Sequence, residues 1–297
     1  FEKLFLKVFT KFSNKKILHN KFPKITYSDA MLKYGTDKPD LRNPLTISDI
    51  TDIFQRDDVK FDIFKKLVKS GSFVRCLIAK DTKDKPRSFF DGIDNWAKEQ
   101  GSSGLAYFTI EKNDKISGKG PVGKFFSENS IKEIMKLTKA EVGDTIFLSC
   151  GNKHDIEKIL NLARTKIAEE LKLIDEDCFS FCWIVDYPIF EKDEITKKIK
   201  FSHNPFSMPQ GDIKNLDFSD PLTMKAYQYD IVCNGVELSS GAIRNHIPEL
   251  MYKLFEIAGY SKSDVDEKFS GMIKALSYGA PPHGGLAPGI DRIVMLL

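Results

Sequence analysis

Two short segments combine charged side chains with glycines in a way that fits a binding site for a nucleotide and a small acid. Residues 234–244 contain a carboxylate, Glu237, and a guanidinium, Arg244, separated by small residues. Residues 289–292 read Gly-Ile-Asp-Arg and lead into an apolar run, so Arg292 is expected just ahead of a helix. A permanent charge in this position fits an anionic ligand such as a phosphate. We therefore expect the two segments to form one site.

The spacing of Glu237 and Arg244 sets a condition on that site. A carboxylate on a sheet beside phosphate groups typically holds Mg²⁺, which takes one or two carboxylates together with phosphate oxygens. A cross-strand ion pair on a solvated face is the alternative for Glu237. Arg244 follows seven positions later, and an odd separation in an ideal strand directs two side chains to opposite faces. They share a site only if the strand kinks or ends near Gly241. A guanidinium there could bind a carboxylate through a bidentate fork.

Two further features carry a weaker chemical signal. His203 precedes Asn-Pro-Phe at the end of an expected strand, where a histidine is commonly structural or exposed. Residues 281–285, Pro-Pro-His-Gly-Gly, predict a rigid loop whose glycines let the backbone approach a ligand closely. The sequence has no G-x-G-x-x-G or Walker motif, so a nucleotide would not bind through a P-loop.

Composition places the chain among ordinary globular proteins. Hydrophobic residues make up 41% and charged residues 29% of the 297 positions. The balance of 45 basic and 42 acidic residues neither announces a nucleic-acid binder nor excludes one. We expect no membrane helix, because no run approaches the ~20 apolar residues that one needs. The five scattered cysteines lack metal-ligand spacing and predict free thiols in a reducing cytoplasm.

The hydrophobic pattern predicts an α+β fold with long antiparallel strands. The chain opens on an amphipathic helix over residues 1–12, without an initiator methionine, and stops inside an apolar run, as a piece of a longer polypeptide would. The expected helices cover 127–136 and 155–173, besides a short strand entering a helix over 25–34. The expected strands cover 73–79, 105–111, 145–150, 179–190, 198–202, 227–233 and 236–240. Asn234-Gly235 predicts a hairpin turn. From about residue 46 to 152 the pattern changes to short alternating strand-like and helix-like segments, which predicts an inserted α/β module.

Several of these segments resemble bacterial-type aspartyl-tRNA synthetases in order and spacing. They are residues 34–42, the Phe-Ser-His-Asn-Pro-Phe of 201–206, and segments 234–244 and 278–292. The resemblance runs end to end, and the middle module resembles the GAD domain inserted in those enzymes. It implies a class II fold, an antiparallel sheet flanked by helices and interrupted by an α/β GAD domain. The implied division is a catalytic domain in two pieces, 1–45 and 155–297, around an insertion at 46–154.

The resemblance also implies where ATP would bind. Gly289, Ile290, Asp291 and Arg292 match motif 3, whose arginine stacks on adenine or contacts an ATP phosphate. Glu237 matches the carboxylate that this family uses for ATP and Mg²⁺. Arg292 and Glu237 are therefore the expected catalytic residues, with Glu237 as the metal ligand.

The expected amino-acid substrate is L-aspartate. Arg244 matches the arginine that binds the side-chain carboxylate of aspartate, and His203 matches a histidine that contacts the amino acid. Asn204 stands where some relatives have histidine, so no role is assigned to it. The implied activity is aspartate-tRNA ligase, acting on tRNA(Asp), and the sequence leaves open whether tRNA(Asn) is charged too. A cytoplasmic homodimer is implied for the full-length protein.

The resemblance also implies what lies outside this sequence. Motif 1, motif 2 and the anticodon-binding barrel would precede Phe1, so we expect this half-site alone to be inactive. Two alternatives stay open: a non-catalytic class II paralogue, and a GAD-containing tRNA-binding protein such as an amidotransferase subunit.

Overall fold

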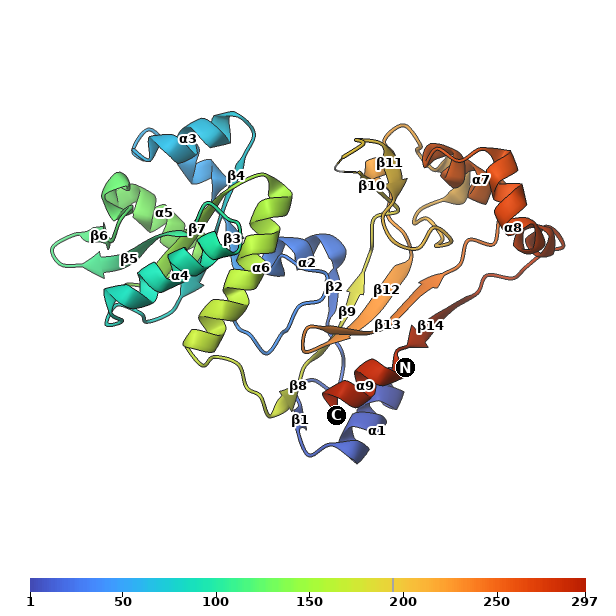
Figure 1. The fold of residues 1–297 in the computed structure, drawn as a ribbon, viewed down its shortest axis with the longest axis horizontal. Helices are drawn as coiled ribbons and strands as arrows, with labels where there is room; N and C mark the ends of the chain where they lie inside the picture. The colour runs from blue at the N-terminus through green and yellow to red at the C-terminus, as the bar shows by residue number, and fades with distance from the viewer. Residues whose placement is uncertain (194) are drawn as a thin grey trace. The chain divides into compact units, whose positions relative to one another are not determined.

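The chain forms two compact units in a computed structural model that describes residues 1–193 and 195–297 (Figure 1). Unit 1 consists of residues 1–28 and 178–297, and unit 2 of residues 29–177. Each unit has its own five-stranded sheet. Helix α2 (Tyr27–Tyr34) spans the boundary between them. No helix in the described ranges is long and apolar enough to cross a membrane.

The sheet of unit 1 is mostly antiparallel, in the order β14-β13-β12-β9-β2, with β2 parallel to β9. Its strands are β14 (Gly284–Pro288), β13 (Val236–Ile243), β12 (Gln228–Cys233), β9 (Phe181–Val185) and β2 (Lys24–Thr26). Helices α1 (Glu2–Phe12) and α9 (Ile290–Leu296) pack on one face, with Phe9 and Ile293 against Phe181 and Leu238. The expected α+β class is confirmed.

The predicted hairpin between β12 and β13 forms at Asn234-Gly235. Both residues have a positive φ, 51° and 82°, as a type I′ turn requires. The Asn234 side chain also anchors the turn, because its Oδ1 accepts a hydrogen bond from the Ser180 N–H at 2.8 Å. Its Nδ2 donates to the Cys178 carbonyl at 3.0 Å. The turn that precedes Glu237 is therefore fixed by its own side chain.

The prediction of one strand over residues 179–190 is wrong. The segment divides into β8 (Cys178–Phe179), β9 and β10 (Phe190–Lys192). Asp186 adopts a left-handed φ of 59°, and Pro188 has no N–H to donate, so the ladder cannot continue through them. Strand β8 instead pairs with β1 (Lys16–Ile17), and β10 pairs with β11 (Ile199–Phe201).

Two helices that the sequence pattern did not reveal complete unit 1. Helix α7 (Pro248–Ile257) begins at a proline, which suits a first helical position. Helix α8 (Lys262–Ser277) begins with a capping box between Ser261 and Asp264 and kinks at Phe269. Short 3-10 turns cover Ile213–Asn215 and Pro221–Thr223.

Unit 2 is an antiparallel sheet in the order β3-β4-β7-β5-β6 with a hydrophobic core on each face. Its strands are β3 (Ile47–Asp49), β4 (Phe73–Ala79), β7 (Thr145–Gly151), β5 (Ala106–Lys112) and β6 (Ile116–Lys119). Helices α3 (Asp62–Lys69) and α5 (Glu128–Thr138) contribute to one core, and α4 (Arg87–Glu99) and α6 (Lys153–Glu170) to the other. Short 3-10 turns cover Thr51–Gln55 and Gly123–Phe125.

Unit 2 extends beyond the expected insertion, 46–154, at both ends because of one buried arginine. Arg164 on α6 is 1% exposed, and its guanidinium donates to the carbonyls of Asp40 (2.7 Å), Asn43 (2.7 Å) and Leu45. The same group lies 4.9 Å from the centre of the Tyr34 ring. Burial lowers the pKa of Arg164 to about 10, so it stays charged at neutral pH. These contacts attach the 34–45 loop and α6 to the sheet of unit 2.

Candidate functional site

A β-bulge at Leu238 resolves the odd spacing between Glu237 and Arg244. Ile231 pairs with Ser239 whereas the next residue of β12, Val232, pairs with Glu237, so Leu238 is the extra residue on β13. The irregularity therefore lies beside Glu237 and not near Gly241, where it was expected. With one residue taken up by the bulge, the remaining separation is even. Glu237 and Arg244 consequently belong to the same face of the sheet.

The register adds an aspartate to this face that the sequence pattern did not reveal. Asp230 pairs with Ser240, and Val232, two residues along β12, pairs with Glu237. Asp230, Ser240 and Glu237 therefore lie on one face. Asp230 is only 3% exposed, and Tyr187 Oη donates to its Oδ2 at 2.7 Å. The signal available in the sequence was the seven-residue spacing from Asp230 to Glu237 across a hairpin turn.

Arg292 and Glu237 meet, as expected. Arg292 Nη1 lies 3.3 Å from Glu237 Oε1 and donates to the Glu237 carbonyl oxygen at 2.7 Å. Arg292 is the third residue of α9, not a residue ahead of the helix. The Arg292 side chain remains 53% exposed, so this contact does not close off its guanidinium.

Gly289, at the start of the 289–292 segment, positions Arg292. Gly289 caps α9 and donates its N–H to the Leu238 carbonyl at 2.8 Å, which fixes the start of the helix against β13. Ile290 and Asp291 are exposed, and within the part of the chain that the structure describes neither side chain forms a hydrogen bond or ion pair with Arg292 or Glu237. Asp291 lies in the first helical turn, where a negative charge is favourable.

Arg244 lies at the end of β13, beside the loop that carries His203. The Arg244 N–H donates to the His283 carbonyl at 2.8 Å, and Arg244 forms an isolated bridge with Ser207. Its side chain lines a hollow of about 330 Å³ together with Phe206 and His283. No carboxylate pairs with this guanidinium among residues 1–193 and 195–297. The charge is thus available for an anionic partner.

The floor beside Arg244 is flat because of one glycine. A Cβ at Gly241 would overlap the Gly285 carbonyl oxygen and lie 2.6 Å from the Leu286 side chain on β14. Strands β13 and β14 can approach each other at this point only because residue 241 has no side chain. The small residues of 239–242 therefore serve the geometry of the sheet as well as any ligand above it.

His203 is exposed and stacks edge-on against two tyrosines. Its ring centre lies 4.8 Å from that of Tyr187 and 5.8 Å from that of Tyr27. Its Nδ1 lies 2.8 Å from the Ser202 hydroxyl. Because Tyr187 also donates to Asp230, the histidine is connected through one ring to the carboxylate on the sheet.

Buried polar atoms cluster around this site. Within the described ranges, the side-chain atoms that have neither solvent contact nor a hydrogen-bond partner include Ser180 Oγ, Ser207 Oγ, Ser239 Oγ, Asn245 Nδ2 and His246 Nδ1. Four of them lie on or beside the segment from Glu237 to His246. Such groups are costly in a folded protein, so they mark this region as less well satisfied than an ordinary core.

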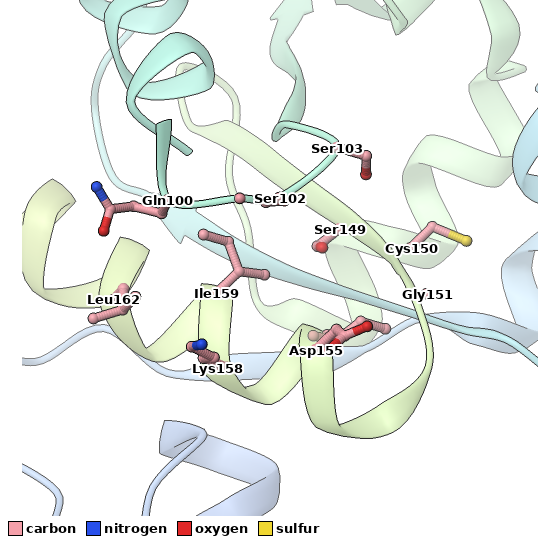
Figure 2. A pocket seen from close by; sticks show the side chains of 12 residues that line it. Gln100, Ser102, Ser103, Ser149, Cys150, Gly151, Asp155, Lys158, Ile159 and Leu162 are labelled. Atoms are coloured by element: carbon pink, nitrogen blue, oxygen red, sulfur yellow. The ribbon is translucent and has the colours of Figure 1, made fainter. Parts of the chain in front are cut away.

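One hollow of unit 2 lacks comparable chemistry. Figure 2 shows this hollow of about 290 Å³, between the end of β7, the 100–103 loop and the start of α6. Its potential nucleophile, Cys150, is half-buried, and burial raises the pKa of the thiol to about 11. The thiol therefore stays protonated at neutral pH and is a poor nucleophile. No group of three metal-ligating side chains occurs in the residues covered by the structure.

Comparison with known proteins decides the family. A family model described as tRNA synthetases class II (D, K and N) matches residues 1–297. The chain belongs to this class II synthetase family. An Aspartate–tRNA(Asp/Asn) ligase of Pelagibacter ubique is 73% identical over 296 residues, covering 100% of this chain and 50% of that protein. Proteins with the same description from Orientia tsutsugamushi and Erythrobacter litoralis are 53% and 54% identical, covering 100% and 98% of this chain and 49% and 48% of their own lengths.

The class II chain thus spans about half the length of the curated relatives it matches. Below, the full-length polypeptide means a chain of the relatives' length that includes these 297 residues. The five cysteines of the 297-residue chain form no disulfide with one another in the described residues.

Proposed function

We propose that the full-length polypeptide is an aspartate–tRNA ligase and that this chain supplies part of its ATP and aspartate site. One observation carries the proposal: the bulge at Leu238 puts Glu237, which is paired with Arg292, on the same sheet face as Arg244. A permanent cation for phosphate, a carboxylate for a metal and a second cation for a carboxylate then share one surface. The identity to proteins described as Aspartate–tRNA(Asp/Asn) ligases supports the same function.

ATP would be held by Arg292, Glu237 and the backbone at Gly289. The donor set fits Mg²⁺, which keeps most of its ligands as water and phosphate oxygens and needs one or two protein carboxylates. Glu237 and Asp230 supply two carboxylates on one face. Mg²⁺ bound there would neutralise phosphate charge. The third residue of α9, Arg292, would stack on adenine or contact a phosphate.

Aspartate would be held by Arg244, with His203 near the amino acid. Because guanidinium has only donors, it matches the acceptor oxygens of a carboxylate, and the NH₂ group of asparagine would face donors. Sites built on buried polar matching discriminate by about 10⁴–10⁵. Arg244 would thus give the selection of the acid over its amide.

The reaction has two steps. The α-carboxylate of aspartate attacks the α-phosphate of ATP in line, which releases pyrophosphate and gives aspartyl-adenylate. The 3′-terminal hydroxyl of tRNA(Asp), or of tRNA(Asn), then takes the aspartyl group and releases AMP. Such chemistry depends on positioning and charge stabilisation, which this set of arginines and carboxylates can provide without a protein nucleophile.

The oligomeric state, the cellular location and the domain limits are also part of the proposal. A homodimer in the cytoplasm would be its working form. Unit 2 would be the GAD-like insertion, with limits nearer to 29–177 than to 46–154.

Pyrophosphate exchange in the full-length polypeptide tests the function. We expect exchange that depends on aspartate, with aspartate preferred over asparagine and lysine. Charging of tRNA(Asp) and tRNA(Asn) transcripts, measured separately, decides the range of acceptors. If asparagine or lysine supported the exchange better than aspartate, that amino acid would be the substrate and the proposal of aspartate would be wrong. No exchange with any amino acid, in a folded protein, would support the non-catalytic paralogue instead.

A further inference from the structure

Unit 2 contains a second hollow, whose lining is strongly basic. It has a volume of about 530 Å³, within the range of about 300–1,000 Å³ of ordinary ligand sites. Four cations line it, with no carboxylate among the lining residues: Lys83, Lys85, Arg87 and Lys119. Phe90, Tyr107, Thr109, Gly120 and Pro121 complete the lining. This hollow contains none of the residues that the proposed function uses.

Two of the four cations are fixed in place. Arg87 pairs with Asp91 at 3.1 Å, and the same carboxyl group accepts a hydrogen bond from Tyr107 Oη at 2.7 Å. Lys119 pairs with Glu111 at 2.8 Å across the β5–β6 hairpin. Both cations remain largely exposed, Arg87 by 84% and Lys119 by 70% of the side chain.

The other two cations, Lys83 and Lys85, carry charge that no carboxylate neutralises. Neither has an ion pair within the described residues, and both are exposed. Lys85 Nζ lies 5.6 Å from the centre of the Phe89 ring. Asp84 separates the two in sequence but does not line the hollow. Positive charge therefore dominates the rim.

The wall that carries Lys119 is tightly built. A Cβ at Gly118 would lie 2.9 Å from the Gly123 Cα, and one at Gly123 would overlap the Gly118 carbonyl. The loop between these glycines is thus closely packed on itself. The floor beneath it is closed by Tyr107 and Phe90, whose rings stack at 5.2 Å between centres. The backbone that carries Lys119 is therefore closely packed.

We infer that this basic hollow of unit 2 binds RNA, with backbone phosphates at the rim formed by Lys83, Lys85, Arg87 and Lys119. Positively charged side chains that contact backbone phosphates give sequence-tolerant binding to nucleic acid. A rim of exposed, spread cations suits a polyanion better than one compact anion. The inference rests on the proposed function, which supplies the RNA as a tRNA.

Binding of a fluorescein-labelled tRNA(Asp) transcript to the 297-residue chain tests this inference. The test variant carries Lys83→Glu and Lys85→Glu. Its matched control carries Lys66→Glu and Lys69→Glu, the same charge change at exposed lysines of α3 in the same unit. We expect the Kd of the test variant to rise at least tenfold and that of the control less than threefold. Each lost phosphate contact should also lower the salt slope, log Kd against log salt, by about one.

An RNA site in this hollow requires that only the test variant loses affinity for tRNA. Equal losses in both variants, or no loss in the test variant, would overturn the inference. A third outcome would also overturn the inference: the test variant binds 5′-AMP more weakly than the wild type but binds tRNA equally well. The hollow would then be a site for a free nucleotide. Aspartate-dependent pyrophosphate exchange, which needs no tRNA, should be normal in the full-length test variant. Failure of the proposed function would appear in that exchange assay, whereas failure of the RNA site would appear only in the binding assay.

Discussion

The two units treat their buried polar groups in opposite ways. In unit 2, Arg75 and Glu157 form a buried ion pair at 3.0 Å, with 5% and 7% of their side chains exposed. The hydroxyl of Thr145 bonds to those of Thr82 and Thr109 at 2.8 and 2.7 Å. In such a closed network each group has its partner, and the network helps to specify one packing arrangement.

Unit 1 instead leaves polar atoms unsatisfied where it carries its charged site. The unpartnered buried atoms named above belong to unit 1, and Asn245 directly follows Arg244. Polar groups that are buried without partners lower the stability of the unit that contains them, and a ligand bound at the charged site of that unit would raise it. The contrast teaches that unit 2 is organised for its own stability and unit 1 for binding. The predictions below test this contrast.

Loss of Arg244 should have the largest effect. Arg244→Leu in the full-length polypeptide should lower aspartate-dependent exchange at least about 10³-fold, because the substrate carboxylate would be desolvated without a partner. Arg244→Lys keeps the charge but loses the planar fork, so it should raise the KM for aspartate and retain more activity. ATP affinity, followed separately, should barely change in either variant. A variant that loses ATP affinity and keeps its aspartate KM would assign Arg244 to the nucleotide.

The buried arginine of unit 2 should matter for stability and not for the site. Arg164→Met leaves the carbonyls of Asp40, Asn43 and Leu45 without their donor, which should destabilise unit 2 by about 1–3 kcal/mol for each carbonyl that stays unsatisfied. Urea unfolding of the 297-residue chain measures this effect. Lys166→Met is the control, since Lys166 makes only an exposed pair with Glu170 on the same helix. Equal unfolding midpoints for the two variants would show that Arg164 is dispensable.

Arg292 should have an intermediate effect that is confined to ATP. Arg292→Ala in the full-length polypeptide removes one charge-assisted contact, which should cost about 1.5–3 kcal/mol, or roughly ten- to a hundredfold in ATP use. Exchange measured at varied ATP and at varied aspartate separates the two substrates. Unchanged KM and kcat for ATP would refute the role of this arginine.

The sequence predicted local structure well where one short signal decides it. The Asn234-Gly235 turn, the strand at 73–79 and the helix capped by Ser127 are all confirmed, the last with a hydrogen bond from the Ser130 N–H to Ser127 Oγ at 3.0 Å. Turn type, capping and β-branched content act over a few residues. A single sequence displays them directly.

Features that depend on distant partners could not be predicted in this way. The bulge at Leu238 is a feature of the register between β12 and β13, and one sequence does not show that register. The role of Arg164 depends on carbonyls more than a hundred residues earlier, and a lone arginine in a helix looks like a surface residue. Asp230 is different, because the predicted Asn234-Gly235 turn already pairs Val232 with Glu237 and so puts Asp230 on the face of Glu237. That signal was overlooked.

The smallest effect is expected from replacing unit 2, provided that its structural limits are used. Substituting residues 29–177 with a Gly/Ser linker in the full-length polypeptide should preserve adenylate formation, because Glu237, Arg244 and Arg292 all belong to unit 1. Substituting only 46–154 keeps α6 but removes the sheet that covers its apolar residues Ile156 and Leu160, so this variant should aggregate. Aspartate-dependent exchange and light scattering measure the two results. Complete loss of exchange in a folded 29–177 replacement would show that unit 2 shapes the site, and the contrast between a self-contained unit and a binding unit would then fail.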